Sequence, residues 1–252
     1  MYKIPSETTF IGKKLFHLPH CTSTSSYLID LIKRNSVSEG AIVITDNQTN
    51  GRGQHGSKWE SEPEQNLTFS ILLNPIFLPI QEQFNLSMTI SIAIATALRP
   101  FLPCPIKLKW PNDIYANNKK LGGVLIENQV QYDTYKVAVV GIGINVNQYH
   151  FTNSKAVSIL NFRGIQHNLN SIFQRIIIAI ENEYLNLKNG KKSQIKLQYL
   201  KSLYKLNTVS RFKTQSGDFF GKIVNVDEDG KLSVEIEGII KKFLFKEISF
   251  LE

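Results

Sequence analysis

Apolar residues along the chain follow helical and strand spacings in alternation up to about residue 205. Helical spacing predicts amphipathic helices over Ser25–Asn35 and Ser171–Leu187, and a densely apolar stretch predicts a buried helix within Pro79–Leu98. Short apolar runs predict strands at Ala41–Thr45, Leu67–Leu73, Lys107–Trp110, Leu121–Glu127 and Lys136–Ile144. This mixture predicts a domain of the α/β class over residues 1–205.

After Asn207 the pattern changes to strands alone. The segment Lys231–Ile236 alternates strictly between polar and apolar residues, which predicts a strand with one buried face. Three dipeptides typical of hairpin turns separate the short strands: Ser216-Gly217, Asp229-Gly230 and Glu237-Gly238. Four or five short strands in roughly 45 residues predict a small β-barrel over residues 206–252, since closure hides the edges of a sheet.

Composition narrows the class of protein. The chain has 252 residues, of which 42% are hydrophobic and 20% are charged, and these values exclude a disordered or fibrous protein. The longest apolar stretch, Met88–Leu98, is interrupted by serine and threonine and is too short to span a bilayer, and the N-terminus carries no secretory signal. Two cysteines, Cys21 and Cys104, are too few for a disulfide framework, so we expect a cytoplasmic location.

The net charge of +8 is compatible with nucleic acid, a membrane surface or an anionic small molecule as a partner. Six lysines and no acidic residue lie between Lys188 and Lys205. They are interleaved with leucines and an isoleucine at helical spacing, namely Ile195, Leu197, Leu200 and Leu203. A solvated helix face is therefore the favoured interpretation, ahead of a functional basic patch.

The segment Gly51–Trp59, with the sequence Gly-Arg-Gly-Gln-His-Gly-Ser-Lys-Trp, carries the densest chemical signal in the chain. It matches the G-x-G-x-x-G pattern but leads into polar loop residues instead of an apolar helix, which excludes a dinucleotide fold, and its Ser-Lys order excludes a Walker A loop. A glycine-rich loop that carries Arg52, His55, Lys58 and the indole of Trp59 favours binding of a phosphate and a base.

Two further segments place polar groups or glycines at strands. A strand that ends in Trp-Pro-Asn-Asp presents an amide at Asn112 and a carboxylate at Asp113, in a position where ligands of α/β folds often bind. Lys120 precedes Gly122-Gly123, and Gly141–Asn147 alternates glycine with apolar residues. Both patterns are typical of a close approach by another backbone or by a ligand.

Other catalytic or metal sites are less favoured. His17, His20 and Cys21 are candidate metal ligands, but no second cluster matches them, so they are interpreted as polar loop residues. The G-x-S-x-G motif of many hydrolases does not occur in the sequence.

In their order and spacing, the motifs resemble those of the biotin–protein ligase family, the biotin–[acetyl-CoA-carboxylase] ligases. The resemblance extends over essentially the whole chain and rests on Gly51-Arg-Gly-x-x-Gly-x-x-Trp59, Lys109-Trp-Pro-Asn-Asp113 with Lys120-Leu-x-Gly123, and Gly141-x-Gly-x-Asn145. It implies an α/β (α+β) catalytic domain with a mixed sheet flanked by helices over residues 1–205. It also implies a small C-terminal SH3-like β-barrel over residues 206–252.

The resemblance implies a two-step reaction. The carboxylate of biotin attacks the α-phosphate of MgATP to give biotinyl-5′-AMP and pyrophosphate, and a lysine of a biotin carboxyl carrier protein or domain then takes the biotinyl group and releases AMP. ATP with Mg²⁺ and biotin are substrates, and neither a permanently bound cofactor nor a metal site made by protein alone is expected. A homodimer is left open, and neither DNA nor a membrane is expected as a partner.

The matching motifs also imply residue roles. Lys120 and Arg52 would stabilise negative charge, and Asp113 would position the incoming lysine or accept its proton. The implied biotin site consists of Ser23, Thr24, Ser25, Gln48, Arg52, Gly53, Gln54, Lys120, Gly122, Gly123, Gly141 and Gly143. The implied ATP site, with adenine near Trp59 and Mg²⁺ near Asn112, consists of Arg52, His55, Lys58, Trp59, Asn112, Lys120 and Asn145.

The sequence departs from the family's usual pattern at three positions. Many members carry arginine where Gln54 and Ser57 stand, and asparagine where Ser25 stands. Two fewer cations in the glycine-rich loop predict that biotinyl-5′-AMP is held less tightly and leaks from the site.

Alternatives remain from the same fold and from another class of protein. A lipoate–protein ligase shares the fold and the acyl-adenylate chemistry, but its own Arg-rich and Gly-rich signature is not found in the sequence. A nucleic-acid-binding module would use the net charge and the barrel, yet Phe243 and Phe245 alternate with Leu244 as core residues of a strand would. Some family members begin with a winged-helix DNA-binding domain; because the ligase motifs here begin near residue 22, no operator binding is expected.

Overall fold

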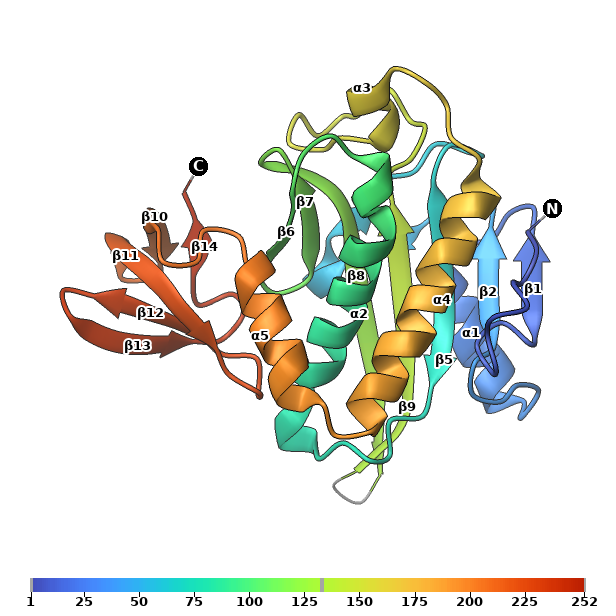
Figure 1. Ribbon diagram of the computed structural model, residues 1–252, viewed down its shortest axis with the longest axis horizontal. Helices are drawn as coiled ribbons and strands as arrows, with labels where there is room; N and C mark the ends of the chain where they lie inside the picture. Colours follow the sequence, from blue (N-terminus) through green and yellow to red (C-terminus); the bar gives the residue numbers. More distant parts are fainter. Residues whose placement is uncertain (1, 132–133, 252) are drawn as a thin grey trace.

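A seven-stranded mixed sheet forms the centre of the molecule (Figure 1). The computed structural model describes residues 2–131 and 134–251, with the side chains of residues 55 and 129–136 outside that description. The order of the strands is β1-β2-β5-β9-β8-β7-β6, and only β1 and β2 are parallel neighbours. The strands are β1 (Leu15–Leu18), β2 (Ile42–Thr45), β5 (Leu67–Leu73), β6 (Ile106–Lys109), β7 (Asp113–Ala116), β8 (Lys119–Gln131) and β9 (Thr134–Ile144). The predicted mixed sheet is confirmed.

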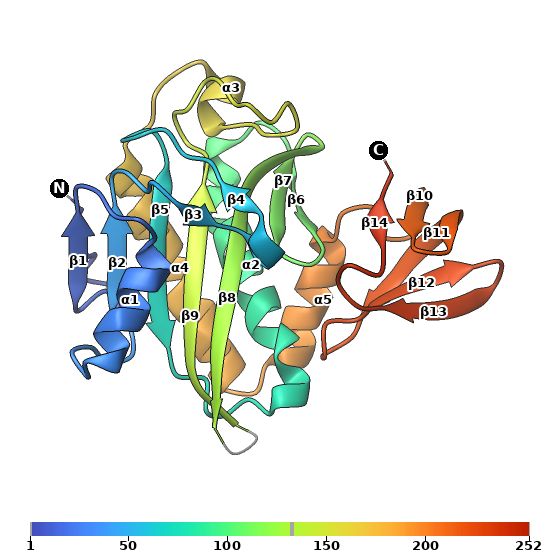
Figure 2. The same cartoon turned by 180° about the vertical axis from the view of Figure 1, so that it is seen from behind.

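Helices cover both faces of this sheet. The long helices α2 (Phe84–Leu98) and α4 (Leu169–Lys188), together with α5 (Lys192–Ser202), lie on one face, and α1 (Thr24–Lys33) lies on the other (Figures 1 and 2). Shorter elements complete the chain: α3 (Ile159–Arg163) and the 3₁₀ turns η1 (Gln54–Gly56), η2 (Ile80–Glu82) and η3 (Arg99–Phe101). The first face of the sheet is covered by three helices, whereas α1 covers only part of the second face, at β2, β5 and β9.

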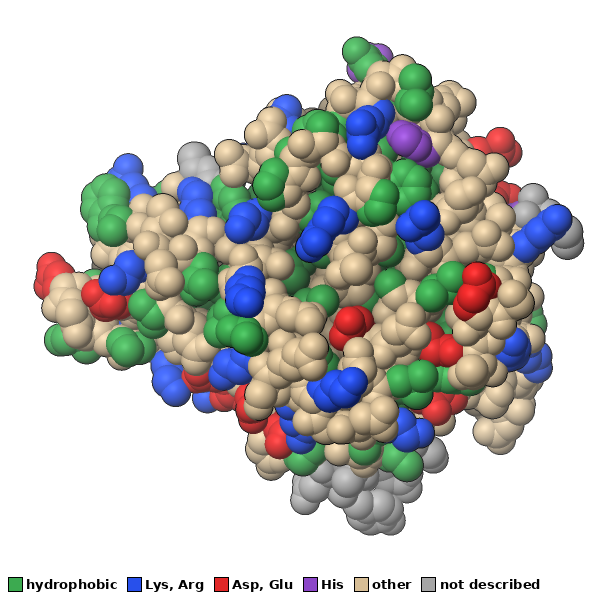
Figure 3. Space-filling model, in the orientation of Figure 1, with side chains coloured by type: hydrophobic (Ala, Val, Ile, Leu, Met, Phe, Trp, Pro, Cys, Tyr) green, Lys and Arg blue, Asp and Glu red, His purple; other side chains and the backbone are tan. Residues whose placement is uncertain are grey.

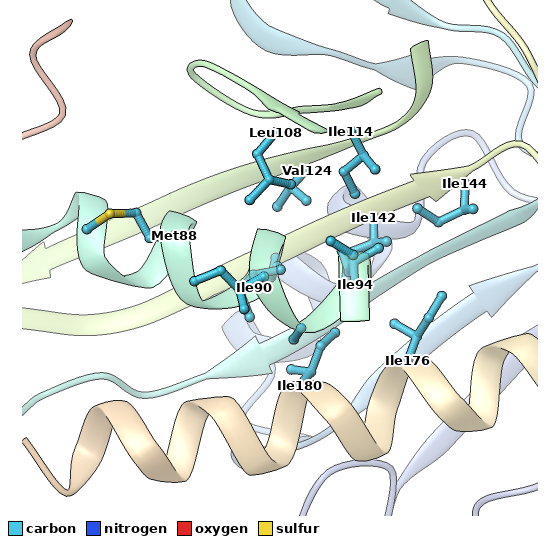
Figure 4. Close-up of a cluster of buried hydrophobic side chains, with 14 of the residues drawn as sticks. Met88, Ile90, Ile94, Leu108, Ile114, Val124, Ile142, Ile144, Ile176 and Ile180 are labelled. Carbon is cyan, nitrogen blue, oxygen red and sulfur yellow. The ribbon is translucent and has the colours of Figure 1, made fainter. Parts of the chain in front are cut away.

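Helix α2 is buried on nearly every side, as the dense apolar stretch predicts. Figure 4 shows Ile90 and Ile94 of this helix between side chains of the sheet, such as Val124 and Ile142, and Ile180 of α4. A helix that is apolar all round is stable only in the interior, and α2 is accordingly enclosed by the sheet, α4 and α5.

The predicted elements agree with the structure where the apolar pattern is long or continuous. Strand β5 has the predicted bounds, and α1, α4, β6, β8 and β9 overlap their predicted segments. Strands β1 and β7 were not predicted, because each has four residues and is bounded by turns instead of by a change of hydrophobic period. In α5 the buried residues are Ile195 and Tyr199, while Leu197 is 55% exposed. Leu197 therefore does not share the apolar stripe that the sequence predicted.

A separate five-stranded antiparallel sheet follows, in the order β13-β12-β11-β10-β14. Its strands are β10 (Val209–Thr214), β11 (Gly217–Val226), β12 (Leu232–Ile236), β13 (Ile239–Phe243) and β14 (Ser249–Phe250). The turn between β12 and β13 places Glu237 and Gly238 at φ values of 50° and 81°, as the two-residue turns favoured in hairpins require. The strands predicted for the C-terminal β-barrel are present and form a separate five-stranded antiparallel sheet.

The two sheets are joined through the interior. The indole Nε1 of Trp110, next to β6, donates to the carbonyl of Gly230 at 2.9 Å, and the amide of Phe84 donates to the carbonyl of Glu228 at 3.1 Å. Buried residues of the C-terminal sheet, such as Phe212 and Val234, belong to the same continuous hydrophobic core as the main sheet. The change from helical to β structure falls between α5 and β10, close to the predicted boundary, but the core continues across it.

Lysine and arginine side chains on the face that carries α2, α4 and α5 are scattered (Figure 3). They are separated from one another by uncharged side chains, and Lys192 of α5 forms an ion pair with Glu82. This distribution is that of a solvated surface. Within the described ranges no helix has the length and apolar character needed to cross a membrane.

Candidate active site

A cavity of about 420 Å³ lies on the α1 side of the main sheet, within the size range of pockets that hold small molecules. Its walls come from the N-terminus of α1, the exposed faces of β8 and β9, the turn after β6, and the C-terminal sheet. A two-stranded ribbon crosses in front of β8 and β9 and forms the remaining wall (Figure 2). The cavity is therefore built from segments far apart in the sequence.

The ribbon is the glycine-rich segment of the sequence. Strand β3 (Gly51–Arg52) pairs with β4 (Lys58–Trp59), with Arg52 opposite Lys58, and η1 forms the tip. The Gly53 amide donates to the carbonyl of Ser57 at 2.7 Å. A Cβ atom added at Gly53 would lie 2.3 Å from Ser57 Oγ, so a larger residue here would require the Ser57 side chain to move. The segment is thus an ordered hairpin that places two cations side by side.

The N-terminus of α1 contributes a buried polar cluster. Ser23 caps the helix, and the backbone amide of Thr24 donates to Gln48 Oε1 at 2.9 Å. Thr24 Oγ1 and Ser25 Oγ lie 2.8 and 3.0 Å from Ser70 Oγ. These hydroxyl and amide groups are suited to recognise a small polar ring system, since each can both donate and accept.

Sequence analysis did not identify Ser70, although its strand β5 was predicted. Thr68 and Ser70 alternate with apolar residues and occupy the cavity face of that strand, where they are 5% and 0% exposed. Two hydroxyl residues at a spacing of two in an otherwise apolar strand were the available signal, because they mark a buried face that needs polar partners.

Glycines of β9 let side chains from other segments pack directly on its backbone at the cavity. A Cβ atom added at Gly143 would lie 2.4 Å from the indole of Trp59, and one added at Gly141 would lie 2.8 Å from Ser25 Oγ. Trp59 therefore packs directly over the backbone of β9. Any larger residue at Gly143 would displace this indole.

Several buried polar atoms at the cavity have no hydrogen-bond partner within the described part of the chain. They are Gln54 Oε1, Trp59 Nε1 and Thr68 Oγ1. A buried polar group without a partner costs about 1–3 kcal/mol. Their place on the cavity wall fits a polar ligand that supplies the missing hydrogen bonds.

Lys120 and Asp113 form the second charged element of the site. Lys120 Nζ lies 2.6 Å from Asp113 Oδ1, with the two side chains 32% and 22% exposed. A Cβ atom at Gly123 would lie 3.5 Å from Lys120 Cε, so the missing side chain leaves room beside this pair. The Asn112 side-chain amide donates to the carbonyl of Val124 at 2.8 Å and fixes the turn that carries Asp113.

Positive charge exceeds negative charge around the cavity. Arg52, Lys58, Lys109 and Lys120 line it, and Asp113 is the carboxylate among its described lining residues. Arg52 also forms an ion pair with Glu127 on β8. This excess of positive charge favours an anionic ligand such as a nucleoside triphosphate or a carboxylate.

Most residues of the predicted site come together here. The cavity is lined by Ser23, Thr24, Ser25, Gln48, Arg52, Gly53, Gln54, Lys58, Trp59, Asn112, Asp113, Lys120, Gly123, Gly141 and Gly143. The side chain of His55 lies outside the described residues. Gly122 and Asn145 are not among the described residues that line the cavity, so their binding roles stay predictions.

The surroundings of Gly122 and Asn145 explain their position. A Cβ atom at Gly122 would lie 2.7 Å from the carbonyl oxygen of Gly143, so this glycine permits close packing of β8 against β9. The side-chain amide of Asn145 donates to the carbonyl of Val157 at 3.1 Å, and its backbone amide donates to Leu121. Both residues act on the frame of the site.

The C-terminal sheet supplies a wall that sequence analysis did not predict. Its contributions to the cavity are Phe212, Leu232, Phe245, Ile248, Ser249 and Phe250. The ring of Phe245 meets that of Trp110 edge to face at 5.8 Å between centroids. No local pattern signals this contact, because the segments are more than a hundred residues apart.

The described residues contain no group of three or more His, Cys, Asp or Glu side chains that could hold a metal ion. His17 Nε2 instead lies 2.8 Å from Asp46 Oδ2. Burial raises the pKa of the Cys21 thiol, which keeps it protonated and weakens it as a metal ligand.

Known proteins are similar to this chain in sequence and in fold. The model of the biotin/lipoate A/B protein ligase family matches residues 18–147. The bifunctional ligase/repressor BirA of Bacillus spizizenii is 30% identical over 247 residues, covering 96% of this chain and 75% of that protein. The biotin–[acetyl-CoA-carboxylase] ligase of Mycobacterium tuberculosis is 26% identical over 221 residues, covering 86% of this chain and 81% of that protein.

A solved structure agrees with these relatives. The biotin protein ligase of Aquifex aeolicus in complex with biotin and ATP superposes with a TM-score of 0.79 at 30% identity, covering 94% of this chain and 98% of that one. The family match extends over half of the chain, and similarity at 30% identity extends over nearly all of it. The chain belongs to the biotin/lipoate A/B protein ligase family and, within it, to the biotin–protein ligases.

Proposed function

We propose that this protein is an ATP-dependent biotin–protein ligase that activates biotin as biotinyl-5′-AMP and transfers it to a lysine of a biotin carboxyl carrier protein. The observation that carries this proposal is the single cavity in which a buried polar cluster lies next to the cations Arg52, Lys58 and Lys120. The biotin protein ligase of Aquifex aeolicus has the same fold at 30% identity, and its structure is of the complex with biotin and ATP.

The polar cluster of Ser23, Thr24, Ser25 and Gln48 suits the ureido ring of biotin, whose N–H and carbonyl groups need both acceptors and donors. Gly141 and Gly143 let Ser25 Oγ and the Trp59 indole approach the backbone of β9, so these two side chains form the surface that a bicyclic ring would contact. In this pose the carboxylate of biotin points toward Lys120. Recognition and chemistry then occupy neighbouring parts of one cavity.

In the first step, a carboxylate oxygen of biotin attacks the α-phosphorus of MgATP, a new P–O bond forms, and the bond to pyrophosphate breaks. Two anions must approach each other and charge accumulates on the phosphoryl oxygens. Lys120 and Arg52 lower this barrier because fixed positive charge stabilises the developing negative charge. Trp59 offers a flat face to the adenine, and the side chain of Asn112 would lie near the Mg²⁺ that ATP brings with it.

In the second step, the uncharged amine of the carrier lysine attacks the carbonyl carbon of biotinyl-5′-AMP. An amide bond forms, the bond to AMP breaks, and the amine loses a proton. Asp113 lies at the cavity wall 2.6 Å from Lys120, so its carboxylate can orient the amine and accept that proton. The biotin–[acetyl-CoA-carboxylase] ligase of Mycobacterium tuberculosis, by its name, modifies a carboxylase, which supports a carrier of this class.

The test is mass spectrometry on the purified protein incubated with MgATP and either biotin or lipoate, with no carrier present. We expect biotinyl-5′-AMP and pyrophosphate in the reaction with biotin, and no adenylate in the reaction with lipoate. A lipoyl adenylate would retain the fold and mechanism but change the substrate. If neither acid gives an adenylate, the proposed function is wrong.

A further inference from the structure

The ribbon of β3 and β4 is tied to the main sheet by an ion pair. Arg52 Nη2 donates to Glu127 Oε2 at 2.7 Å, across a separation of 75 residues in the sequence. Glu127 lies on β8, on the same face as Gly123 and Leu125, and both of these line the cavity. The carboxylate therefore holds the arginine at the edge of the cavity.

Other contacts fix the two ends of the ribbon: the amide of Asn50, which precedes β3, donates to the carbonyl of Thr22 at 2.9 Å. The indole of Trp59 packs over Gly143 and anchors β4. Within the ribbon, the hydrogen bonds Gly53 N to Ser57 O and Ser57 Oγ to Gln54 O stabilise the hairpin itself and do not fix it to the sheet.

The local charges give Glu127 a further effect. Arg52 and Lys58 are opposite each other in the ribbon, so two like charges are adjacent. The Glu127 carboxylate offsets this repulsion. It accepts from one guanidinium nitrogen, and a guanidinium has five N–H donors in a rigid fork, so Arg52 can hold Glu127 and an anionic ligand at the same time.

We propose that Glu127 is the positioning residue for Arg52, which it orders at the cavity before any ligand binds. This inference rests on the proposed function for its catalytic consequence, but its structural part concerns the protein alone. An arginine ordered in advance loses less conformational freedom when the ligand anion arrives, so binding is strengthened without a new contact to the ligand.

Limited proteolysis with trypsin tests the structural part without substrates, because Arg52 and Lys58 are themselves cleavage sites within the ribbon. Glu127→Gln removes the charge and keeps the size of the side chain. We expect it to accelerate cleavage after Lys58 by about two- to fivefold, the range for loss of a partly exposed ion pair. An unchanged cleavage rate would overturn the proposal.

Coupling to Arg52 is tested with Arg52→Ala and the double variant. Cleavage after Lys58 can still be followed in both. Glu127→Gln should have no further effect once Arg52 is absent. Acceleration of the same size in the Arg52→Ala background would show that Glu127 acts through another contact, and the proposal would be wrong. The matched control is Asp218→Asn, which removes the 3.0 Å ion pair with Arg211 in the C-terminal sheet and should leave ribbon cleavage unchanged.

The catalytic consequence is read from adenylation kinetics. In Glu127→Gln, Arg52 must become ordered when the ligand binds, which weakens binding. We expect this variant to raise KM for biotin and ATP by about two- to fivefold and to change kcat by less than about twofold. Glu127→Asp should give an intermediate KM. A fall in KM would show that Glu127 competes with the ligand, and would overturn the proposal. Absence of adenylation by the wild-type protein would instead contradict the proposed function and leave the proteolysis result valid.

Discussion

Lys120 is held from its backbone, which directs its side chain at the cavity. Its amide donates to the carbonyl of Lys155 at 2.7 Å, and its carbonyl accepts from the amide of Val157 at 2.9 Å. Asp113 then orients the ammonium group. A long, flexible side chain is in this way placed as a fixed charge, which is what stabilisation of a phosphoryl transition state requires.

Lys120→Ala should lower the rate of adenylate formation by about 10²- to 10³-fold, since a charge aimed at the transition state is removed. The rate is measured as pyrophosphate release with biotin and MgATP. Lys119→Ala is the matched control, because Lys119 is the exposed neighbour on the same strand. A clearly lower unfolding temperature for Lys120→Ala would show that Lys120 stabilises the fold instead.

At the scale of elements, the ribbon is stabilised by hydrogen bonds of its own. Gln54 Oε1 is buried without a partner in the described part of the chain, at a position where many family members carry arginine. Ser57 Oγ is used within the hairpin, where it donates to the carbonyl of Gln54 at 2.8 Å. The hairpin is therefore stabilised by its own hydrogen bonds and does not depend on those arginines for its conformation.

Gln54→Arg should slow the release of biotinyl-5′-AMP by about three- to tenfold, because an added cation at the cavity interacts with the phosphate. Release is measured as the adenylate that passes a filter over time when no carrier is present. Gln54→Leu controls for the loss of the amide. If the wild-type protein releases no adenylate under these conditions, the expectation of a leaking intermediate is wrong.

A second element-scale feature is the attachment of the N-terminal segment to α4. The buried Glu181 carboxylate accepts hydrogen bonds from the amides of Thr9, Phe10 and Ile11 and from the hydroxyl of Thr9. Burial alone would raise the pKa of Glu181, but these hydrogen bonds outweigh it and lower the pKa from its usual value. The ionised carboxylate thus stabilises the folded chain.

Glu181→Gln should lower the free energy of unfolding by about 2 kcal/mol at neutral pH, because amide N–H groups lose an ionised acceptor. A depressed pKa gives stability that is present above the unfolded-state value, about 4.3, and is lost as pH falls through the folded-state value. The difference between variant and wild type should therefore shrink below that pH in denaturant titrations. Glu183→Gln, on the same helix, should change little at any pH; a constant difference for Glu181→Gln would contradict the linkage.

At the scale of the whole molecule, residues of the C-terminal sheet and of the main sheet line one cavity. The sheet contributes Phe245 and Phe250 to the cavity wall, and the Trp110 indole joins the two parts through its hydrogen bond to Gly230. Because the hydrophobic core continues between them, the C-terminal sheet completes the cavity as a fixed wall.

Trp110→Phe should lower the free energy of unfolding by about 1 kcal/mol, because the carbonyl of Gly230 loses its donor, and it should raise KM for ATP. Thermal unfolding and adenylation kinetics measure the two effects. Tyr149→Phe, at a 64% exposed ring, is the control and should change neither. Unchanged KM with lowered stability would show that the contact holds the two sheets together without shaping the site.

The fold and site differ in how far the sequence specifies them. Local pattern determined β5, whose apolar run is continuous, the hairpin turns of the C-terminal sheet, and the motif residues Arg52, Lys120 and Asp113. Turn propensity and hydrophobic period act over a few residues, so they can be read directly. Strand β1 could not be predicted because an edge strand of four half-buried residues carries almost no period.

Contacts between distant segments were decided by the tertiary structure alone. The Arg52–Glu127 pair, the hydroxyl of Ser70 beneath α1, and the aromatic wall around Phe245 join residues whose separation in sequence has no fixed relation to their distance in space. Strand order and packing set those distances, and one-dimensional spacing contains neither. The sequence by itself therefore determined which groups are candidates for the chemistry, and only the fold decided which of them meet, because long-range proximity follows from burial of the core and not from local pattern.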